Sequence, residues 1–202
     1  MGVSFSMPSD SSSERSSISF YALEEELLTE TLHCHDRNEL VLVTKGEGEC
    51  QLGELETGLG VGFLGYASAG TWHAYWSQHV DRTGEKLSAL VVRFPRIVAP
   101  EPLLNLEEAS GLRLWIERME HGGFVRLAQY DRIQARMMTI QGARGMLRVA
   151  RLFALFDLLI QIDGWQVVEN QLLGKRERSD RERLKAAISS CRIALLGADS
   201  TR

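Results

Sequence analysis

Short runs of alternating apolar and polar residues dominate the first half of the chain. Four of these runs are rich in β-branched and aromatic residues and are typical of strands: residues 18–23, 27–33, 39–44 and 86–94. Glycines recur between them from Gly46 to Gly70, as tight turns between short antiparallel strands require. No long helical pattern interrupts the runs, which disfavours a parallel sheet. We therefore expect an antiparallel barrel or jelly roll over residues 18–95.

The hydrophobic period changes after Pro95. From there apolar residues recur every three or four positions, which predicts amphipathic helices. The expected elements are a short helix from Pro100, a helix over 112–119, a returning strand at 122–127, a helix ending near Ile140 and a helix over 145–162. We expect this helical segment, residues 96–173, to pack on the barrel.

The helix expected over residues 145–162 has no single polar stripe. Three arginines lie on one side, whereas Asp157 and Gln161 lie on another. Apolar surface on several sides predicts contacts with both the barrel and a second subunit, and simple burial between neighbouring elements is the alternative. In a homodimer, the expected interface residues are Leu152, Leu155 and Leu159.

The two ends of the chain differ from the rest in composition. Residues 1–17 are rich in serine and poor in large apolar residues, so we expect a disordered N-terminal arm. Residues 174–202 begin with interleaved basic and acidic side chains, which predict a charged linker, and continue into one more terminal helix.

Composition narrows the classes of function. The chain has 202 residues, of which 44% are hydrophobic and 25% charged, as in ordinary globular proteins. Its net charge of −4 and pI near 5.8 argue against a nucleic-acid-binding surface. Three cysteines without paired spacing fit a reducing compartment, and neither a signal peptide nor a membrane-spanning run is evident. We expect a cytoplasmic protein that does not contact the membrane.

Three histidines and a glutamate carry the candidate chemistry. His33, His35 and Glu39 share one parity, so on a single strand their side chains point to the same side and Cys34 points away. His73 follows a second glycine-rich stretch in a strand-like setting. Imidazole and carboxylate groups suit a divalent metal such as Zn, Ni, Fe or Mn, and this set leaves open coordination positions.

Three interpretations of these side chains remain open. They hold a metal, they bind a small molecule directly with Trp72 and Tyr75 as aromatic walls, or they form a hydrogen-bonded cluster without a ligand. If it is buried, the Glu39 carboxylate needs a partner. We expect neither Arg37 nor Lys45 to reach it, so a metal or a histidine is the expected partner.

The spacing of these residues resembles the two motifs of the cupin superfamily. The first match is His33-x-His35-x3-Glu39-x6-Gly46, with Leu27 where the motif usually begins with glycine. The second is Gly62-x5-Ser68-x-Gly70-x2-His73, with Ser68 at the usual proline and Ser77 at the usual asparagine. The resemblance implies a cupin barrel, also called a double-stranded β-helix, that binds a metal through the three histidines and Glu39.

Residues 90–95 and the helices expected after them resemble the amino-terminal sensor half of AraC-type transcriptional regulators, over roughly residues 17–165. This resemblance implies an effector-sensing and dimerisation module that binds a small molecule in the barrel. It also implies a role for the serine-rich arm as a cover over the effector, and an unstructured tail is the alternative. The DNA-binding half is absent from these residues, so we expect DNA contact only through a domain that this chain lacks.

An enzyme is the main alternative to a regulator. Many cupins are metal-dependent dioxygenases, isomerases or decarboxylases, and this ligand set would suffice for them. Beyond the ligands, however, the sequence offers no placed general acid or base, since His79 and His121 are candidates by residue type alone. We therefore expect a non-enzyme. A third hypothesis is a truncated partner that blocks a full-length regulator through the 145–162 helix.

Overall fold

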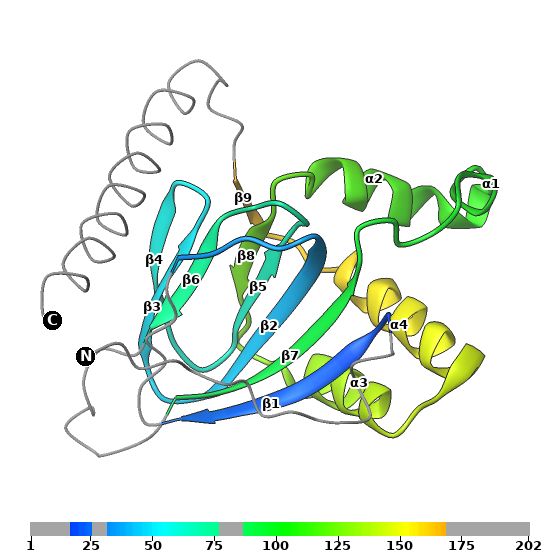
Figure 1. Cartoon of the computed structure of the whole chain (residues 1–202). Coiled ribbons are helices and arrows are strands. Elements are labelled where there is room, and N and C mark those ends of the chain that lie inside the picture. The colour runs from blue at the N-terminus through cyan, green and yellow to red at the C-terminus, as the bar shows by residue number, and fades with distance from the viewer. Residues whose placement is uncertain (1–16, 26–31, 77–86, 169–202) are drawn as a thin grey trace, which may run out of the picture. The chain divides into compact units, whose positions relative to one another are not determined.

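Two antiparallel sheets form the body of the protein in a computed structural model that describes residues 17–25, 32–76 and 87–168. The larger sheet has the order β1 (Ser19–Glu25), β7 (Leu87–Pro95), β2 (Arg37–Lys45), β5 (Phe63–Ala67), β8 (Gly123–Arg126) and β9 (Gln166–Val167). The smaller sheet has the order β4 (Leu55–Leu59), β3 (Gly48–Leu52) and β6 (His73–Trp76) (Figure 1). The predicted fold class, a mainly β jelly-roll barrel with helices after it, is confirmed.

Helices follow β7, as the change of period after Pro95 predicts. They are α1 (Glu101–Leu104), the 3-10 turn η1 (Glu107–Ala109), α2 (Ser110–Arg118), α3 (Asp131–Gln141) and α4 (Gly145–Leu159). Between α2 and α3 the chain returns to the sheet as β8, which pairs with β5. The sequence pattern indicated β8, but it did not indicate β9.

The central strands of the six-stranded sheet, β2, β5 and β7, are buried on both faces. Val41 and Val43 of β2 point into the barrel and join an inner cluster, which also contains residues of the three-stranded sheet. Leu40 and Leu42 point the other way and join an outer cluster with residues of α2, α3 and α4. In Figure 1 these helices lie on one side of the larger sheet. The alternation expected for residues 39–44 is therefore present, because successive side chains of a strand point to opposite faces.

His33 and His35 do not belong to β2, so they do not share with Glu39 the single strand on which the prediction from parity depended. The strand begins at Arg37, and His33 instead forms an isolated antiparallel bridge with His73. Each of these two residues donates its backbone N–H to the other's carbonyl oxygen, at 3.0 and 2.8 Å. Residues 27–31 of the other predicted strand lie outside the described residues.

The three leucines expected at a dimer interface are core residues of the same chain. Leu152, Leu155 and Leu159 have 3%, 0% and 1% of their surface exposed and belong to the outer cluster. Simple burial between neighbouring elements, the alternative left open by the sequence, accounts for them. The exposed large apolar residues of α4 are Met146 and Leu147 at its start.

Several predictions fall outside the described residues. The arm expected at residues 1–17 is described only at Ser17, and the predicted charged linker and terminal helix lie wholly in residues 169–202. His79 is in the undescribed range 77–86. Within the described part of the chain, no helix combines the length and the apolar character needed to span a bilayer.

Candidate metal centre

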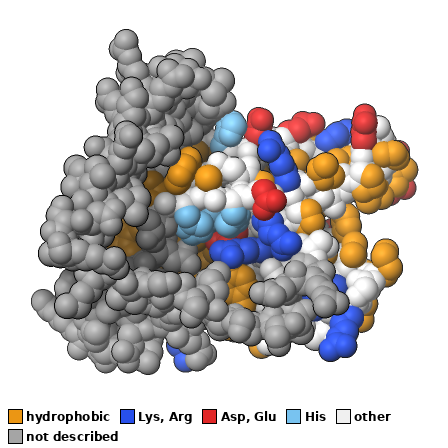
Figure 2. Space-filling view, viewed as in Figure 1, with side chains coloured by type: hydrophobic (Ala, Val, Ile, Leu, Met, Phe, Trp, Pro, Cys, Tyr) orange, Lys and Arg blue, Asp and Glu red, His pale blue; other side chains and the backbone are white. Residues whose placement is uncertain are grey.

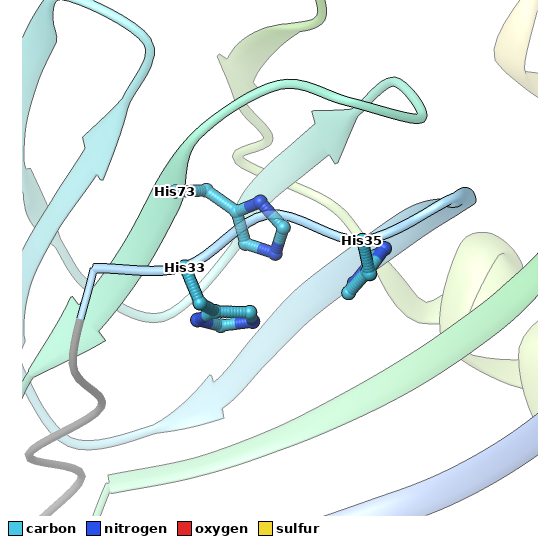
Figure 3. A group of neighbouring side chains, drawn as sticks. All are labelled: His33, His35 and His73. Carbon is cyan, nitrogen blue, oxygen red and sulfur yellow. The ribbon is translucent and has the colours of Figure 1, made fainter. Parts of the chain in front are cut away.

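Three imidazole rings converge at one end of the barrel (Figure 3). His73 is the first residue of β6, the backbone bridge places His33 opposite it, and His35 lies just before β2. Ring centroids are 4.4 Å apart for His33 and His73, and 4.9 Å apart for His35 and His73. One ring nitrogen from each residue lies within 4.8 Å of the other two, a spacing that suits a shared metal ion.

Backbone carbonyl groups orient two of these rings. His73 Nδ1 lies 2.8 Å from the carbonyl oxygen of Thr71, and His35 Nδ1 lies 2.9 Å from that of Arg37. Because a carbonyl oxygen can only accept, each Nδ1 carries the proton and donates it. In the neutral imidazole, the lone pair is therefore on Nε2, which is the arrangement that a metal ligand requires.

Glu39 lies beside the imidazoles, in the inner face of β2. It is buried, with 2% of its side chain exposed, and its Oε2 lies 3.4 Å from His35 Nε2 while its Oε1 lies 3.5 Å from His73 Nε2. Arg93 Nε donates a hydrogen bond to Oε2, and the Tyr21 hydroxyl donates to the same oxygen at 3.4 Å. The expectation that a metal or a histidine is the partner of Glu39 is thus incomplete, since an arginine also neutralises it.

Arg93 is a residue of the centre that the sequence patterns did not indicate. It lies directly opposite Glu39 in the register between β7 and β2, and it is two residues after Val91 of the inner cluster. Its guanidinium group lies 5.1 Å from the centre of the Tyr21 ring. A single charged residue inside the apolar run of residues 87–95 was the available signal, because burying an isolated charge is costly and predicts an acidic partner.

The environment shifts two ionisable groups. Burial alone would raise the pKa of Glu39, but His35, His73 and Arg93 outweigh it and hold this pKa well below its usual value, so the carboxylate is ionised. Burial alone would lower the pKa of His73, but the adjacent Glu39 carboxylate raises it above its usual value. A proton on His73 Nε2 and a metal ion are therefore alternatives at the same atom.

One buried atom tests whether a metal fits. His73 Nε2 is shielded from solvent and makes no hydrogen bond to the described residues, although Glu39 Oε1 is 3.5 Å away. A buried polar atom that makes no hydrogen bond is costly, and coordination would satisfy it. The donor set therefore fits a divalent metal, with His33, His35 and His73 as ligands and Glu39 next to them.

The other predicted site residues differ in their positions. Tyr75 is buried in the inner cluster, with its ring 5.8 Å from that of His73, whereas Trp72 has an exposed side chain. His121 is half-buried beside Glu120, outside the three-histidine group. Cys34 is exposed, which agrees with its expected orientation away from the interior.

The centre is only partly enclosed by the described residues. His73 and Glu39 are buried, whereas 21% of the His35 side chain and 18% of the Arg93 side chain are exposed. On the face shown in Figure 2, histidine side chains reach the surface beside basic and acidic side chains.

Comparisons with known proteins give partial likenesses. No protein-family model matches the sequence, and no curated protein matches it either. Among solved structures, a variant of oxalate decarboxylase from Bacillus subtilis is 16% identical, with a TM-score of 0.32 over 41% of this chain and 22% of that one. A cupin 2 domain-containing protein from Halorhodospira halophila is 20% identical, with a TM-score of 0.34 over 42% of this chain and 56% of that one.

A third similar structure is apo ToxT from Vibrio cholerae, as a variant, which is 9% identical, with a TM-score of 0.48 over 71% of this chain and 54% of that one. This chain thus spans less than two thirds of each of the three proteins. At these scores the likeness assigns neither an activity nor a partner to it.

Proposed function

We propose that this protein is a cytoplasmic sensor module that binds a divalent metal and, through it, a small-molecule effector. The observation that carries the proposal is the convergence of three imidazole nitrogens within 4.8 Å of one another. Imidazole suits Zn, Ni, Fe and Mn sites, and three histidines with one carboxylate leave positions for an exogenous ligand.

Different residues have different roles at this centre. The Thr71 and Arg37 carbonyl oxygens orient the rings of His73 and His35 and leave their Nε2 atoms available, so these atoms would be the ones to hold a metal. Arg93 and Tyr21 hold the Glu39 carboxylate in place. When bound, the metal would supply a Lewis acid that orients an oxygen-bearing ligand.

A sensor needs a second element that responds, and the helices supply one. Residues of β2 and β7 that alternate with those of the inner face pack against α3 and α4, so the sheet connects the centre to the helical layer. This arrangement favours an effector-sensing and dimerisation module of an AraC-like regulator. In that case a homodimer would use exposed residues such as Met146 and Leu147, and DNA would be bound by another domain.

A metal-dependent cupin enzyme of dioxygenase or isomerase type remains the second candidate. The partial exposure of His35 favours it, because substrate could reach an open coordination position. Turnover of a small organic substrate by the metal-loaded protein, lost when His33 and His73 are replaced, would support the enzyme over the sensor.

The decisive experiment measures metal content and affinity. The purified wild type, the double variant His33→Ala/His73→Ala and the control His121→Ala are each titrated with Zn²⁺, Ni²⁺, Fe²⁺ and Mn²⁺ by calorimetry and analysed by elemental mass spectrometry. We expect one bound ion in the wild type and the control and none in the double variant, since one remaining imidazole and the Glu39 carboxylate are too few ligands. Equal metal content in all three proteins would refute the ligand assignment.

The sensor role has a separate test. Sedimentation of the chain with and without the bound metal reports whether occupancy changes the association state, and Met146→Glu/Leu147→Glu tests the exposed start of α4. We expect the wild type to be a dimer and the Met146→Glu/Leu147→Glu variant to be a folded monomer. A wild type that is monomeric with and without metal would exclude a dimerisation module while leaving metal binding intact.

A further inference from the structure

The turn between β5 and β6 contacts two of the three candidate ligands. Gly70 donates its backbone N–H to the carbonyl oxygen of His35 at 2.8 Å, and the Thr71 carbonyl oxygen accepts from His73 Nδ1 at 2.8 Å. The turn closes on itself through the Thr71 N–H, which donates to the Ser68 carbonyl oxygen at 2.9 Å. A displacement of His73 is therefore also a displacement of this turn.

The opposite side of the same turn is attached to the end of α2. The Ser68 hydroxyl donates to the Glu120 carbonyl oxygen at 2.6 Å, and the Thr71 hydroxyl donates to the His121 carbonyl oxygen at 3.1 Å. Both acceptors belong to the short segment that leads from α2 into β8. Two side chains of one turn thus connect it to the helical layer.

The hydroxyl groups of Ser68 and Thr71 also contact each other, so the hydrogen bonds between the turn and the segment after α2 can rearrange. Ser68 Oγ lies 2.8 Å from Thr71 Oγ1, in addition to the two carbonyl contacts. Each hydroxyl has one proton, so two protons serve three contacts and one contact is always without a hydrogen. A small shift of the turn can therefore transfer a hydrogen bond from one of the two carbonyl oxygens to the contact between the hydroxyl groups, while the other carbonyl oxygen stays hydrogen-bonded.

The segment between α2 and β8 packs closely against β5 at Gly122. A Cβ atom at Gly122 would lie 2.4 Å from the Tyr66 carbonyl oxygen, and the residue has a φ of +92°, so only glycine fits there. On α2 itself, Trp115 packs 4.9 Å from Tyr66 and 5.5 Å from Phe156 between ring centres. Movement at residues 120–122 therefore reaches the aromatic part of the outer cluster.

We infer that Thr71 is a positioning residue that connects His73 to the segment after α2, so that metal occupancy changes the local stability of α2. This inference rests on the proposed metal site, and it adds the route by which the helices respond. The Thr71 carbonyl orients the His73 ring, while its hydroxyl holds the helix end. One residue thus acts on both sides of the turn.

Hydrogen–deuterium exchange of peptides covering residues 110–121 tests the inference, with and without whichever of the four metals the wild type binds most tightly. We expect metal to slow exchange there in the wild type, and Thr71→Val to lose this protection while its metal affinity falls by no more than about tenfold. Thr71→Ser, which keeps the hydroxyl, should keep the protection that metal gives to residues 110–121. Thr44→Val is the matched control, because it removes a threonine hydroxyl that donates to a backbone carbonyl, that of Ser88, at 3.2 Å on another part of the sheet.

Three outcomes would overturn the inference: unchanged protection in Thr71→Val, equal loss in Thr44→Val, or no metal effect on residues 110–121 in a wild type that binds metal. Only a wild type that binds no metal would refute the proposed function as well. If Thr71→Val fails to fold, Ser68→Ala removes the other anchor, and retention of full protection in that variant would count against the route.

Discussion

The two faces of the six-stranded sheet are built from the same strands but perform different tasks. On the outer face, Leu40, Leu42 and their neighbours meet an aromatic and aliphatic layer from the helices. On the inner face, the apolar cluster gives way at one end to Glu39, Arg93 and the histidines. The outer face therefore provides stability through apolar burial, whereas the inner face holds charge that burial alone would disfavour.

The contrast shows how a barrel carries a polar centre. Glu39 is directly opposite Arg93 in the strand register, so the ion pair forms across two adjacent strands that are themselves fixed by the outer core. The centre depends on the apolar face, since the strands hold the charges together. The predictions below test this dependence.

The largest expected effect comes from the outer face. Leu155→Ala removes a fully buried side chain from α4 and should lower the free energy of unfolding by about 2–5 kcal/mol through lost burial and a cavity. Leu147→Ala on the same helix, at a side chain that is 54% exposed, is the control and should change it by less than about 0.5 kcal/mol. Urea denaturation measures both, and equal effects would contradict the assignment of Leu155 to the core.

A smaller effect is expected on the inner face. Arg93→Met leaves the buried Glu39 carboxylate without its arginine, and the histidines compensate only in part. We therefore expect the free energy of unfolding to fall by about 1.5–3 kcal/mol. Arg113→Met removes a hydrogen bond to the Leu104 carbonyl oxygen away from the centre and should cost less than about 1 kcal/mol. If the two variants are equally stable, the Glu39–Arg93 pair does not contribute as described.

The prediction with the smallest expected effect concerns the alkylation of Cys34 and Cys50. Cys50 lies in the inner cluster, where burial and then the charge of Glu39 raise the pKa of its thiol to about 12, whereas Cys34 is exposed. Because the thiolate is the reactive form, an alkylating reagent at neutral pH should modify Cys34 in the native protein and Cys50 only after denaturation. Peptide mass mapping follows each site, and rapid native labelling of Cys50 would show that the inner face is open.

The sequence predicted the faces of β2 and the order of the elements, because both depend on local periodicity. Val41 and Val43 point inward as expected, and the helices begin after Pro95. The spacing of the two motifs predicted that His33 and His73 lie close together, but it did not indicate the backbone contact that brings them together. Their proximity depends on a backbone bridge between distant segments, which no local pattern encodes.

The function of α4 was harder to predict from sequence. An apolar helix that packs on its own sheet and one that packs on a second subunit have the same composition, so the sequence pattern predicted Leu155 at a dimer interface although it lies in the core of its own chain. Arg93 was missed for a similar reason, since its partner is 54 positions away in the chain. Only the strand register brings the two charges together.

The backbone bridge between His33 and His73 has a consequence for local stability. Two hydrogen bonds between these residues keep His33 at the centre, and within residues 32–36, the described part of this segment, the bridge lies outside the named strands. Local opening of so short a pairing requires far less free energy than unfolding of the barrel. If the centre holds a metal, opening of this bridge would move one ligand away while the core of the barrel stays closed.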